Sequence, residues 1–252
     1  MDAAVNTSYN MELVVLSYVI SAVGAFMALV SAKRLLSGKS AGQSYRLGLL
    51  STGIALGGIG VWSMHFIAML ALRMDLGVGY SIWETGISLI AAVLISALAF
   101  HIVARNPHNM GRLLTAGSML GMGAVVMHYL GMYGMRFGGH FQWDYGRVAL
   151  SVLIALVAAT AALWLAFHTV QISARLLAAA IMAIAVCAMH YTGMSAAEFI
   201  CTTNTPLAIP GGSSVVSALG LPLVVVALAF GMSLFLILDL LRASFQRYQR
   251  PA

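Results

Sequence analysis

Charged residues are scarce in this sequence. Of its 252 residues, 8% are Asp, Glu, Lys or Arg and 61% are hydrophobic, and the mean hydropathy is +0.95. Soluble domains carry about 25% charged residues, so the composition excludes an ordinary soluble protein and predicts a protein of the lipid bilayer. The net charge of +6 fits basic residues at a membrane face that carries anionic lipid, and we expect no nucleic-acid partner.

Cysteines and catalytic patterns are also scarce. The chain has two cysteines; Cys187 lies in an apolar run and Cys201 follows that run, so a disulfide between them is an open possibility. No nucleophile–base constellation and no phosphate-binding loop stands out, so we expect no enzyme within this chain. The only lysines, Lys33 and Lys39, fall at one membrane face, which excludes a mid-membrane Schiff base of the retinal type.

Long apolar runs make up most of the sequence. A run of about 18 or more residues with few charges is typical of a membrane-spanning helix, and seven such runs predict an all-α integral membrane fold. No basic segment precedes the first run, so we expect that run to be retained and not removed as a signal peptide. The runs are Leu13–Ser31, Leu47–Leu70, Ile82–Val103, Leu113–Met135, Val148–Phe167, Leu176–Ala197 and Gly220–Leu241.

Lys and Arg divide unequally between the two membrane faces. Ten fall on one face and three on the other, and this excess predicts that the first face is cytoplasmic. The N-terminus is then outside and the C-terminus inside. The ten are Lys33, Arg34, Lys39, Arg46, Arg105, Arg112, Arg175, Arg242, Arg247 and Arg250, and the three are Arg73, Arg136 and Arg147.

One tripeptide, Met-His-aromatic, occurs three times inside these runs, each time with a second Met four residues after the His. The histidines are 128 − 65 = 63 and 190 − 128 = 62 residues apart. An ionisable side chain inside a membrane segment is costly and is usually retained for function, so three at a constant spacing indicate a shared site. The segments are Met64-His65-Phe66 with Met69, Met127-His128-Tyr129 with Met132, and Met189-His190-Tyr191 with Met194.

The spacing of the motif corresponds to two helices with their loops. The repeating unit is an odd-numbered span followed by an even-numbered span that carries the motif near its outer end. Three such helix pairs and a lone seventh helix form one membrane domain, residues 1–241, followed by a cytoplasmic tail, residues 242–252. A charged residue follows each His by eight positions, which predicts that the histidines share one layer about 12 Å below the outer boundary; these residues are Arg73, Arg136 and Glu198.

The first motif helix is longer than the other two. From the inner basic residues Arg46, Arg112 and Arg175, the histidines come 19, 16 and 15 positions later, so we expect a tilt or a distortion in the first motif helix. Glycines crowd two of the motif helices, and small residues let helices approach closely in lipid. We therefore expect the motif helices to pack together at the axis, with the third, fifth and seventh spans facing lipid; the glycines are Gly53, Gly57, Gly58, Gly60, Gly117, Gly121 and Gly123.

Imidazole and thioether groups are metal ligands, and their combination favours copper. Residues four apart share a helix face, so each His and the Met after it point the same way. The Met before each His lies about 100° round the helix, so packing explains it equally well. The candidates exceed the roughly four ligands of one such ion, which leaves one ion or two open; they are His65, His128, His190, Met69, Met132, Met194, Met64, Met127 and Met189.

Several residues near the motifs are candidates for lesser roles. Gly131 and Gly193 lie within the second and third motifs, where we expect them to permit local distortion of the helix. Cys187, one turn before His190, is a candidate for a supporting position behind the ligands. His140 lies in an outer loop, where it is either an ordinary surface residue or an aid to metal access.

These motifs resemble the MHYT domain, a bacterial integral-membrane sensor family named after Met-His-Tyr-Thr. The third motif reads Met189-His190-Tyr191-Thr192, the second has Leu130 in the last place, and the first reads Met64-His65-Phe66-Ile67. The resemblance covers nearly the whole chain. It implies a multi-pass protein of the bacterial inner membrane that binds copper through the Met and His of the motif and senses oxygen, carbon monoxide, nitric oxide or copper itself.

The resemblance also implies partners. GGDEF and EAL domains that make and break cyclic di-GMP often follow such a membrane domain, and the inner end of the seventh helix is where one would join. A homodimer would suit paired output domains. Two other functions stay open from the residues. One is a copper permease, although the sequence offers no second polar layer below the motifs for a transport route. The other is a haem protein with His/Met axial ligands.

Overall fold

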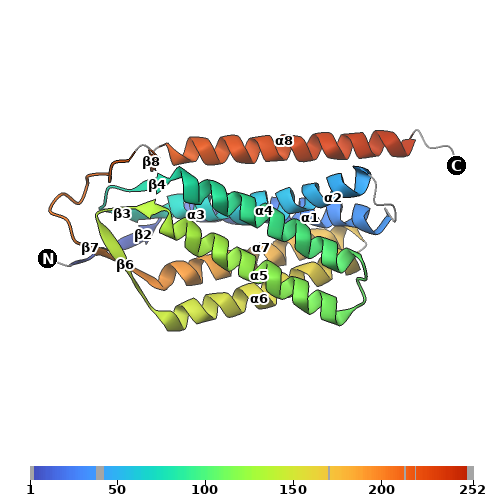
Figure 1. Cartoon of the computed structure of the whole chain (residues 1–252), viewed down its shortest axis with the longest axis horizontal. Coiled ribbons are helices and arrows are strands. Elements are labelled where there is room, and N and C mark those ends of the chain that lie inside the picture. The colour runs from blue at the N-terminus through green and yellow to red at the C-terminus, as the bar shows by residue number, and fades with distance from the viewer. Residues whose placement is uncertain (1–2, 38–42, 170, 213, 219, 249–252) are drawn as a thin grey trace.

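The structure, a computed structural model, describes residues 3–37, 43–169, 171–212, 214–218 and 220–248. Within these residues it is mostly helical, with seven helical spans long and apolar enough to cross a membrane, which confirms the predicted number. The bundle is elongated, and short strands gather with the N-terminus at one end, whereas α8 runs toward the C-terminus at the other (Figure 1). We call the end with the strands the sheet end.

Most helix ends lie within four residues of the predicted bounds. Two do not: α1 continues to Ser37, 37 − 31 = 6 residues past the predicted end, and α8 continues to Tyr248, 248 − 241 = 7 residues past it, so residues 242–248 of the predicted tail are helical. α5 and α6 begin after Asn109 and Asp144, whose side-chain oxygens accept hydrogen bonds from the backbone N–H of Arg112 and Arg147, as N-caps do. The second span is continuous through three segments, α2, η1 and α3. The helices are α1 (Met11–Ser37), α2 (Gln43–Gly53), η1 (Ile54–Ser63), α3 (Met64–Ala71), α4 (Ile82–Ala104), α5 (Met110–Tyr133), α6 (Tyr145–His168), α7 (Ile172–Ser195) and α8 (Leu221–Tyr248).

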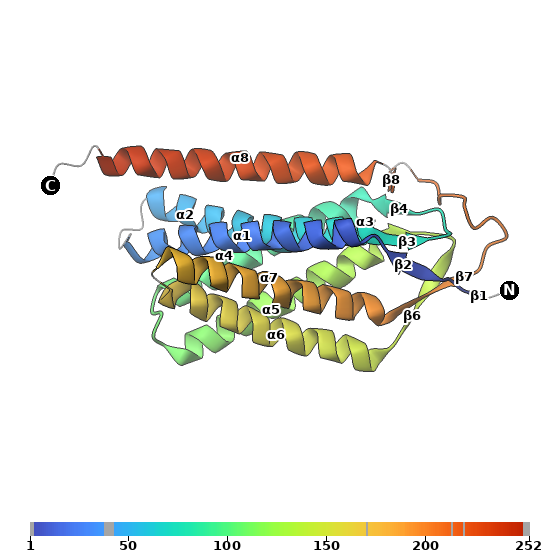
Figure 2. The same ribbon diagram turned by 180° about the vertical axis from the view of Figure 1, so that it is seen from behind.

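Six of the spans form a closed ring, in which α1 packs on both α7 and the η1–α3 part of the second span, and α4, α5 and α6 complete the circuit. α8 lies outside this ring against α2, η1 and α3 (Figure 2). The lone seventh helix expected from the repeat is therefore confirmed. The three motif spans are also the most buried: 89% of the most apolar window of the second span is buried, against 17% for α8.

The first motif span contains the expected distortion. Residues Ile54–Ser63 form a π-helix, whose wide turns hold more residues per unit length than an α-helix and thereby absorb the extra residues before His65. The Ser63 hydroxyl donates to the carbonyl of Gly58, five residues earlier, at 3.0 Å. Long π-helices are rare, and π-turns occur often at functional sites.

The glycines of the motif spans do not join these spans to one another, and this part of the prediction is wrong. Gly57 lies against the Ala92 backbone of α4, Gly60 lies beside Gly24 of α1, and Gly121 lies against the Ala155 backbone of α6. Small residues permit a close approach of two backbones, and here the backbones that approach are those of a motif span and the odd-numbered spans beside it. The motif spans meet one another at the histidines and, farther from the sheet end, around one cavity that Leu56, Leu120 and Met182 help to line.

Eight short strands stand at the sheet end, beyond the expected all-α architecture. All pairings are antiparallel, and the sheets are ordered β1-β7-β6, β2-β3 and β5-β4-β8. Each motif span leads into a strand whose second residue is the charged one expected at the helix end, namely Arg73, Arg136 or Glu198. The strands are β1 (Ala3–Ala4), β2 (Thr7–Tyr9), β3 (Leu72–Met74), β4 (Gly79–Ser81), β5 (Met135–Arg136), β6 (Gly139–Trp143), β7 (Ala197–Cys201) and β8 (Val215–Ser217).

Basic residues divide between the two ends as the sequence predicts. Arg73, Arg136 and Arg147 belong to the sheet end, and Lys33, Arg34, Arg46, Arg105, Arg112, Arg175, Arg242 and Arg247 belong to elements at or near the other end. Lys39 and Arg250 fall outside the described residues, as does the last part of the predicted tail, residues 249–252. The assignment of the sheet end to the outside stays a prediction.

Candidate metal centre

The three motif histidines meet at the centre of the ring. His65 comes from α3, His128 from α5 and His190 from α7. Their Nδ1 atoms form a triangle, with sides of 3.1 Å between His65 and His190, 3.1 Å between His65 and His128, and 3.2 Å between His128 and His190. The predicted convergence of three imidazoles from different spans is what the structure contains. We call this cluster the His triad.

The His triad is sealed from solvent. All three side chains are fully buried, and the ring planes stand nearly perpendicular to one another, at 79 to 86° with centroids 4.9 to 5.0 Å apart. Among the described residues, none of the three Nε2 atoms has a hydrogen-bond partner. Buried polar groups are nearly always hydrogen-bonded, and exceptions call for an explanation such as an ion or a functional role.

The glycine of the second and third motifs makes room for a neighbouring imidazole. A Cβ at Gly131 would collide with Nε2 of His65, and a Cβ at Gly193 would collide with Nε2 of His128. α5 and α7 run as continuous α-helices through these positions. The expectation that these glycines allow helix distortion is therefore wrong, because each one leaves room for the imidazole of the preceding motif.

The aromatic residue after each His supports its ring from the side. Phe66, Tyr129 and Tyr191 each contact the preceding imidazole edge to face, with centroids 4.8 to 4.9 Å apart. The Tyr129 hydroxyl lies 2.8 Å from Ser151 Oγ of α6, and the Tyr191 hydroxyl lies 3.1 Å from Ser17 Oγ of α1. The tyrosines thus anchor two motif helices to their neighbours.

The first motif uses a different anchor. Phe66 has no hydroxyl, and the indole N–H of Trp62, one turn earlier, donates instead to Ser88 Oγ of α4 at 3.1 Å.

At the sheet end, Tyr9 packs edge to face on Tyr191. Burial and the neighbouring Tyr191 raise the pKa of Tyr9 to about 12, so its phenol is neutral at physiological pH.

The geometry of the triad fits a metal ion. The centre of a triangle with sides of about 3.1 Å lies about 1.8 Å from each corner, close to the metal–imidazole bond length of about 2.0 Å. Three nitrogens at the corners of such a triangle cannot make linear hydrogen bonds to one another, because an N–H that points to the centre of the triangle points between the other two nitrogens. A donor set of neutral imidazoles without carboxylate suits zinc, copper, iron or nickel, and does not suit magnesium or calcium.

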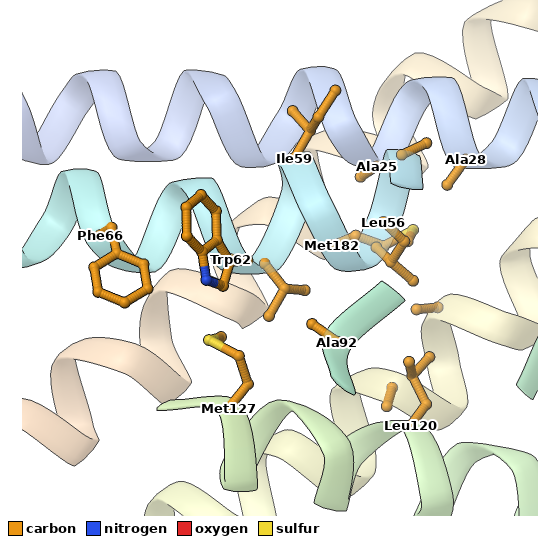
Figure 3. Packing of buried hydrophobic residues seen from close by; sticks show 14 of the residues in the cluster. Ala25, Ala28, Leu56, Ile59, Trp62, Phe66, Ala92, Leu120, Met127 and Met182 are labelled. Carbon is orange, nitrogen blue, oxygen red and sulfur yellow. The ribbon is translucent and has the colours of Figure 1, made fainter. Parts of the chain in front are cut away.

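All six motif methionines are buried, at 0 to 2% exposure. Met69, Met132 and Met194 follow the histidines by one turn toward the sheet end, on the same helix faces. Of the preceding methionines, Met127 lies across from Trp62 (Figure 3), and Met189 packs with Val125 and Ala155. Whether any sulfur ligates an ion stays a prediction.

An apolar cavity of about 40 Å³ lies next to the triad on the side away from the sheet end. Met189, the residue before His190, is part of its wall. The remaining wall comes from η1, α5, α6 and α7 and contains no charged or hydrogen-bonding side chain: Leu56, Val61, Leu120, Ala124, Ala155, Ala158, Ala159, Ala162, Met182, Ala185 and Val186. Apolar cavities of this kind stay dry and accept small apolar molecules.

Other candidates lie apart from the triad. Cys187 and Cys201 are both free thiols, so the disulfide that the sequence left open is not formed. His140 is exposed on β6. The rings of the triad contact one another directly, and this spacing leaves no room between them for a haem macrocycle, which counts against the haem alternative.

One buried polar cluster was missed by the sequence analysis. Asp239 of α8 accepts a hydrogen bond from Arg34 of α1 at 2.6 Å and from Ser51 of α2 at 2.5 Å, both at the same carboxylate oxygen. Asp239 is the one acid that falls inside a predicted apolar run away from its outer end, and an acid in a membrane span is itself a signal of a specific partner. We call this cluster the Asp239 clamp.

Six apolar spans in a ring around a buried triad of histidines, with a seventh packed outside, define a multi-pass membrane protein. The MHYT family, described as a bacterial signalling protein N-terminal repeat, matches residues 58–116, 121–179 and 184–246, and the chain belongs to this family. The matched repeats start 121 − 58 = 63 and 184 − 121 = 63 residues apart, which is the period of the motif. They pair each motif span with the span after it, a different phase from the unit we expected.

Curated relatives are signalling proteins. The chain is 36% identical over 198 residues to the bifunctional diguanylate cyclase/cyclic di-GMP phosphodiesterase MucR of Pseudomonas aeruginosa, with 77% of this chain and 28% of the relative covered. It is 33% identical over 208 residues to the cyclic di-GMP phosphodiesterase NbdA of the same organism, with 80% and 26% covered. The chain thus spans about a quarter of the length of these relatives. No solved structure matches it.

Proposed function

We propose that the His triad binds copper and that this chain is the sensory part of a membrane signalling protein. The observation that carries the proposal is the meeting of three Nδ1 atoms, 3.1 to 3.2 Å apart, on fully buried side chains at the centre of the ring. Neutral imidazoles with methionines one turn away are a donor set that favours copper over harder ions. Bound copper would supply a redox-active centre to which a small gas can bind.

The proposed signal is oxygen, nitric oxide, carbon monoxide or a change in the copper itself. The apolar cavity beside Met189 supports a gas, because a small uncharged molecule dissolves in the lipid and can occupy an apolar cavity at no cost in hydrogen bonds. We place the sheet end outside, following the excess of basic residues at the other end. The triad then lies in the outer leaflet, where the gas arrives without crossing the cytoplasm.

The proposed output passes through α8 to a cytoplasmic cyclic di-GMP domain of the kind named in the relatives. α8 packs along the second span. The Met232 sulfur lies against Gly58 of η1, and Asp239 bonds Ser51 of α2. Gly58 is seven residues before His65 in the same continuous span. A change at the triad can shift α8 only if the ligand binds the two arrangements with different affinity. Any catalysis belongs to such a following domain.

Copper analysis of the purified chain in lipid nanodiscs tests the proposal. The wild type is expected to hold about one copper per chain, and the H65A/H128A/H190A variant none. The matched control is H101A/H108A/H168A, which removes the three histidines at the other end of the bundle and should keep the copper. Full retention of copper by the triad variant would refute the site.

A further inference from the structure

A second cavity, of about 280 Å³, opens at the sheet end between α3, β3, β4 and β5. Ten residues line it, and three of them are methionines: Met69, Met74 and Met135. The remaining wall is Leu70, Leu72, Arg73, Leu76, Val78, Tyr80 and Ala218. With 16 methionines in 252 residues, fewer than one would be expected among ten, so the sulfur content of this cavity is distinctive. We call it the methionine vestibule.

One wall residue of the vestibule comes from a motif that also supplies the His triad. Met69 belongs to the first motif and follows His65 by four residues on the same helix face, a rise of about 6 Å. Met69 is buried, at 2% exposure, whereas Met74 on β3 is partly exposed. Met135 begins β5 and pairs with Tyr80 of β4. The three sulfurs therefore belong to residues that lead from the partly exposed rim to the helix turn above the triad.

The chemistry of the wall selects one class of ligand. Thioethers are soft ligands that select Cu(I), and the wall contains no carboxylate for a hard cation such as Ca²⁺ or Mg²⁺. Burial raises the pKa of Tyr80, so its phenol is neutral. Arg73 is exposed at the rim, where solvent and salt screen its charge.

The vestibule is too wide to grip an ion in one fixed geometry. A bound ion must lie about 2.3 Å from each sulfur ligand. The cavity of about 280 Å³ has room for several atoms, so its wall does not surround a single ion closely. Methionine is unbranched and has three rotatable bonds, so the thioethers can close on an ion in turn. We propose that the methionine vestibule captures Cu(I) from outside and that Met69 delivers it to the triad, an inference that rests on the proposed function.

Silver(I), a soft monovalent ion without redox chemistry, tests the vestibule separately from the triad. The full chain with ¹³C-labelled methionine methyl groups, in nanodiscs, is titrated with Ag(I) in the H65A/H128A/H190A background, or in the H128L background if the triple variant does not fold. The methyl signals of Met69, Met74 and Met135 are expected to shift, and those of the exposed Met110 and Met122 are not. Unchanged vestibule signals would overturn the proposal.

Copper loading of the otherwise wild-type chain supplies the second measurement. The M74L/M135L variant is expected to load its triad about tenfold more slowly than wild type or M110L/M122L, because it loses the ligands that raise the local ion concentration, and to reach the same final copper content. Equal loading rates would overturn the proposal. Silver shifts in a chain that never retains copper would instead contradict the proposed function and leave the vestibule as a soft-metal site.

Discussion

Two buried polar clusters lie in one apolar bundle, and they are built in opposite ways. In the Asp239 clamp, a carboxylate accepts from both Arg34 and Ser51, so a positive and a negative charge compensate each other. In the His triad, three imidazoles turn the same ring atom toward one point, and their Nε2 atoms have no partner among the described residues. The clamp brings together opposite charges of the protein, whereas the triad brings together three groups of the same kind.

The difference separates a structural role from a binding role. Removing one member of a buried ion pair leaves an uncompensated charge and is strongly destabilising. Unsatisfied imidazoles, by contrast, lower the stability of the metal-free fold, as functional sites often do. The clamp should therefore govern how firmly α8 is held, and the triad should govern what the bundle binds.

The largest effect is expected from the clamp. Replacing Asp239 by Ala removes the buried carboxylate that bonds Arg34 and Ser51, so we expect the free energy of unfolding to fall by about 3–5 kcal/mol, with copper binding at the triad retained. Denaturation of the chain in detergent measures the loss, and Asp75→Ala, at an exposed position of the sheet end, is the matched control. A variant as stable as this control would contradict the role given to the clamp.

The triad is expected to respond in the opposite direction. Leu at position 128 has a similar volume to His and removes an unsatisfied buried polar group, so the metal-free protein should become more stable by up to about 1–3 kcal/mol. The same denaturation experiment, run with and without a chelator, shows whether this gain is confined to the metal-free state. A clear loss of stability without metal would mean that the triad is a structural cluster like the clamp.

The glycines beside the triad give an intermediate effect. Gly131→Ala and Gly193→Ala place a Cβ against the ring of His65 or His128, so we expect copper affinity to fall about 10–100-fold, as for other changes behind metal ligands. Gly86→Ala and Gly231→Ala meet nothing within 4 Å and are the controls. Competition titrations against a chelator of known affinity measure the difference, and equal affinities in all four variants would argue against ring position as the determinant.

The smallest effect is expected from the tyrosines. Tyr129→Phe and Tyr191→Phe each remove one hydroxyl contact, with Ser151 or Ser17, which is worth about 1 kcal/mol of stability. Copper content should not change, because Phe66 already occupies this place in the first motif. Loss of copper from either variant would assign the phenol a direct part in the site.

Periodicity and composition were sufficient for the architecture. Seven apolar runs predicted the spans, and the spacing of 62 to 63 residues predicted a repeat of two spans, although not its phase. The longer approach to His65 predicted a distortion, found as the π-helix Ile54–Ser63. The number of spans and the period of the motif can be read along a single chain. The distortion follows because each span must cross a membrane of fixed thickness, so extra residues must be accommodated within the helix. The meeting of the three histidines followed from the same repeat.

Contacts between spans could not be predicted in the same way. The strands at the sheet end depend on pairing between loops far apart in the sequence, such as β1 with β7. The direction that Gly57 or Gly121 faces depends on helix rotation, which a stretch of small and aliphatic residues does not fix. Asp239 carried a visible signal, an acid inside an apolar run, but its partners Arg34 and Ser51 come from other spans.

X-ray absorption at the copper edge of the purified, copper-loaded chain tests the central claim most directly. Copper held by the His triad predicts three imidazole nitrogens at about 2.0 Å around one ion, and a loss of the imidazole signal in H65A/H128A/H190A. A spectrum of sulfur ligands without imidazole, or one unchanged by the triple substitution, would contradict the account.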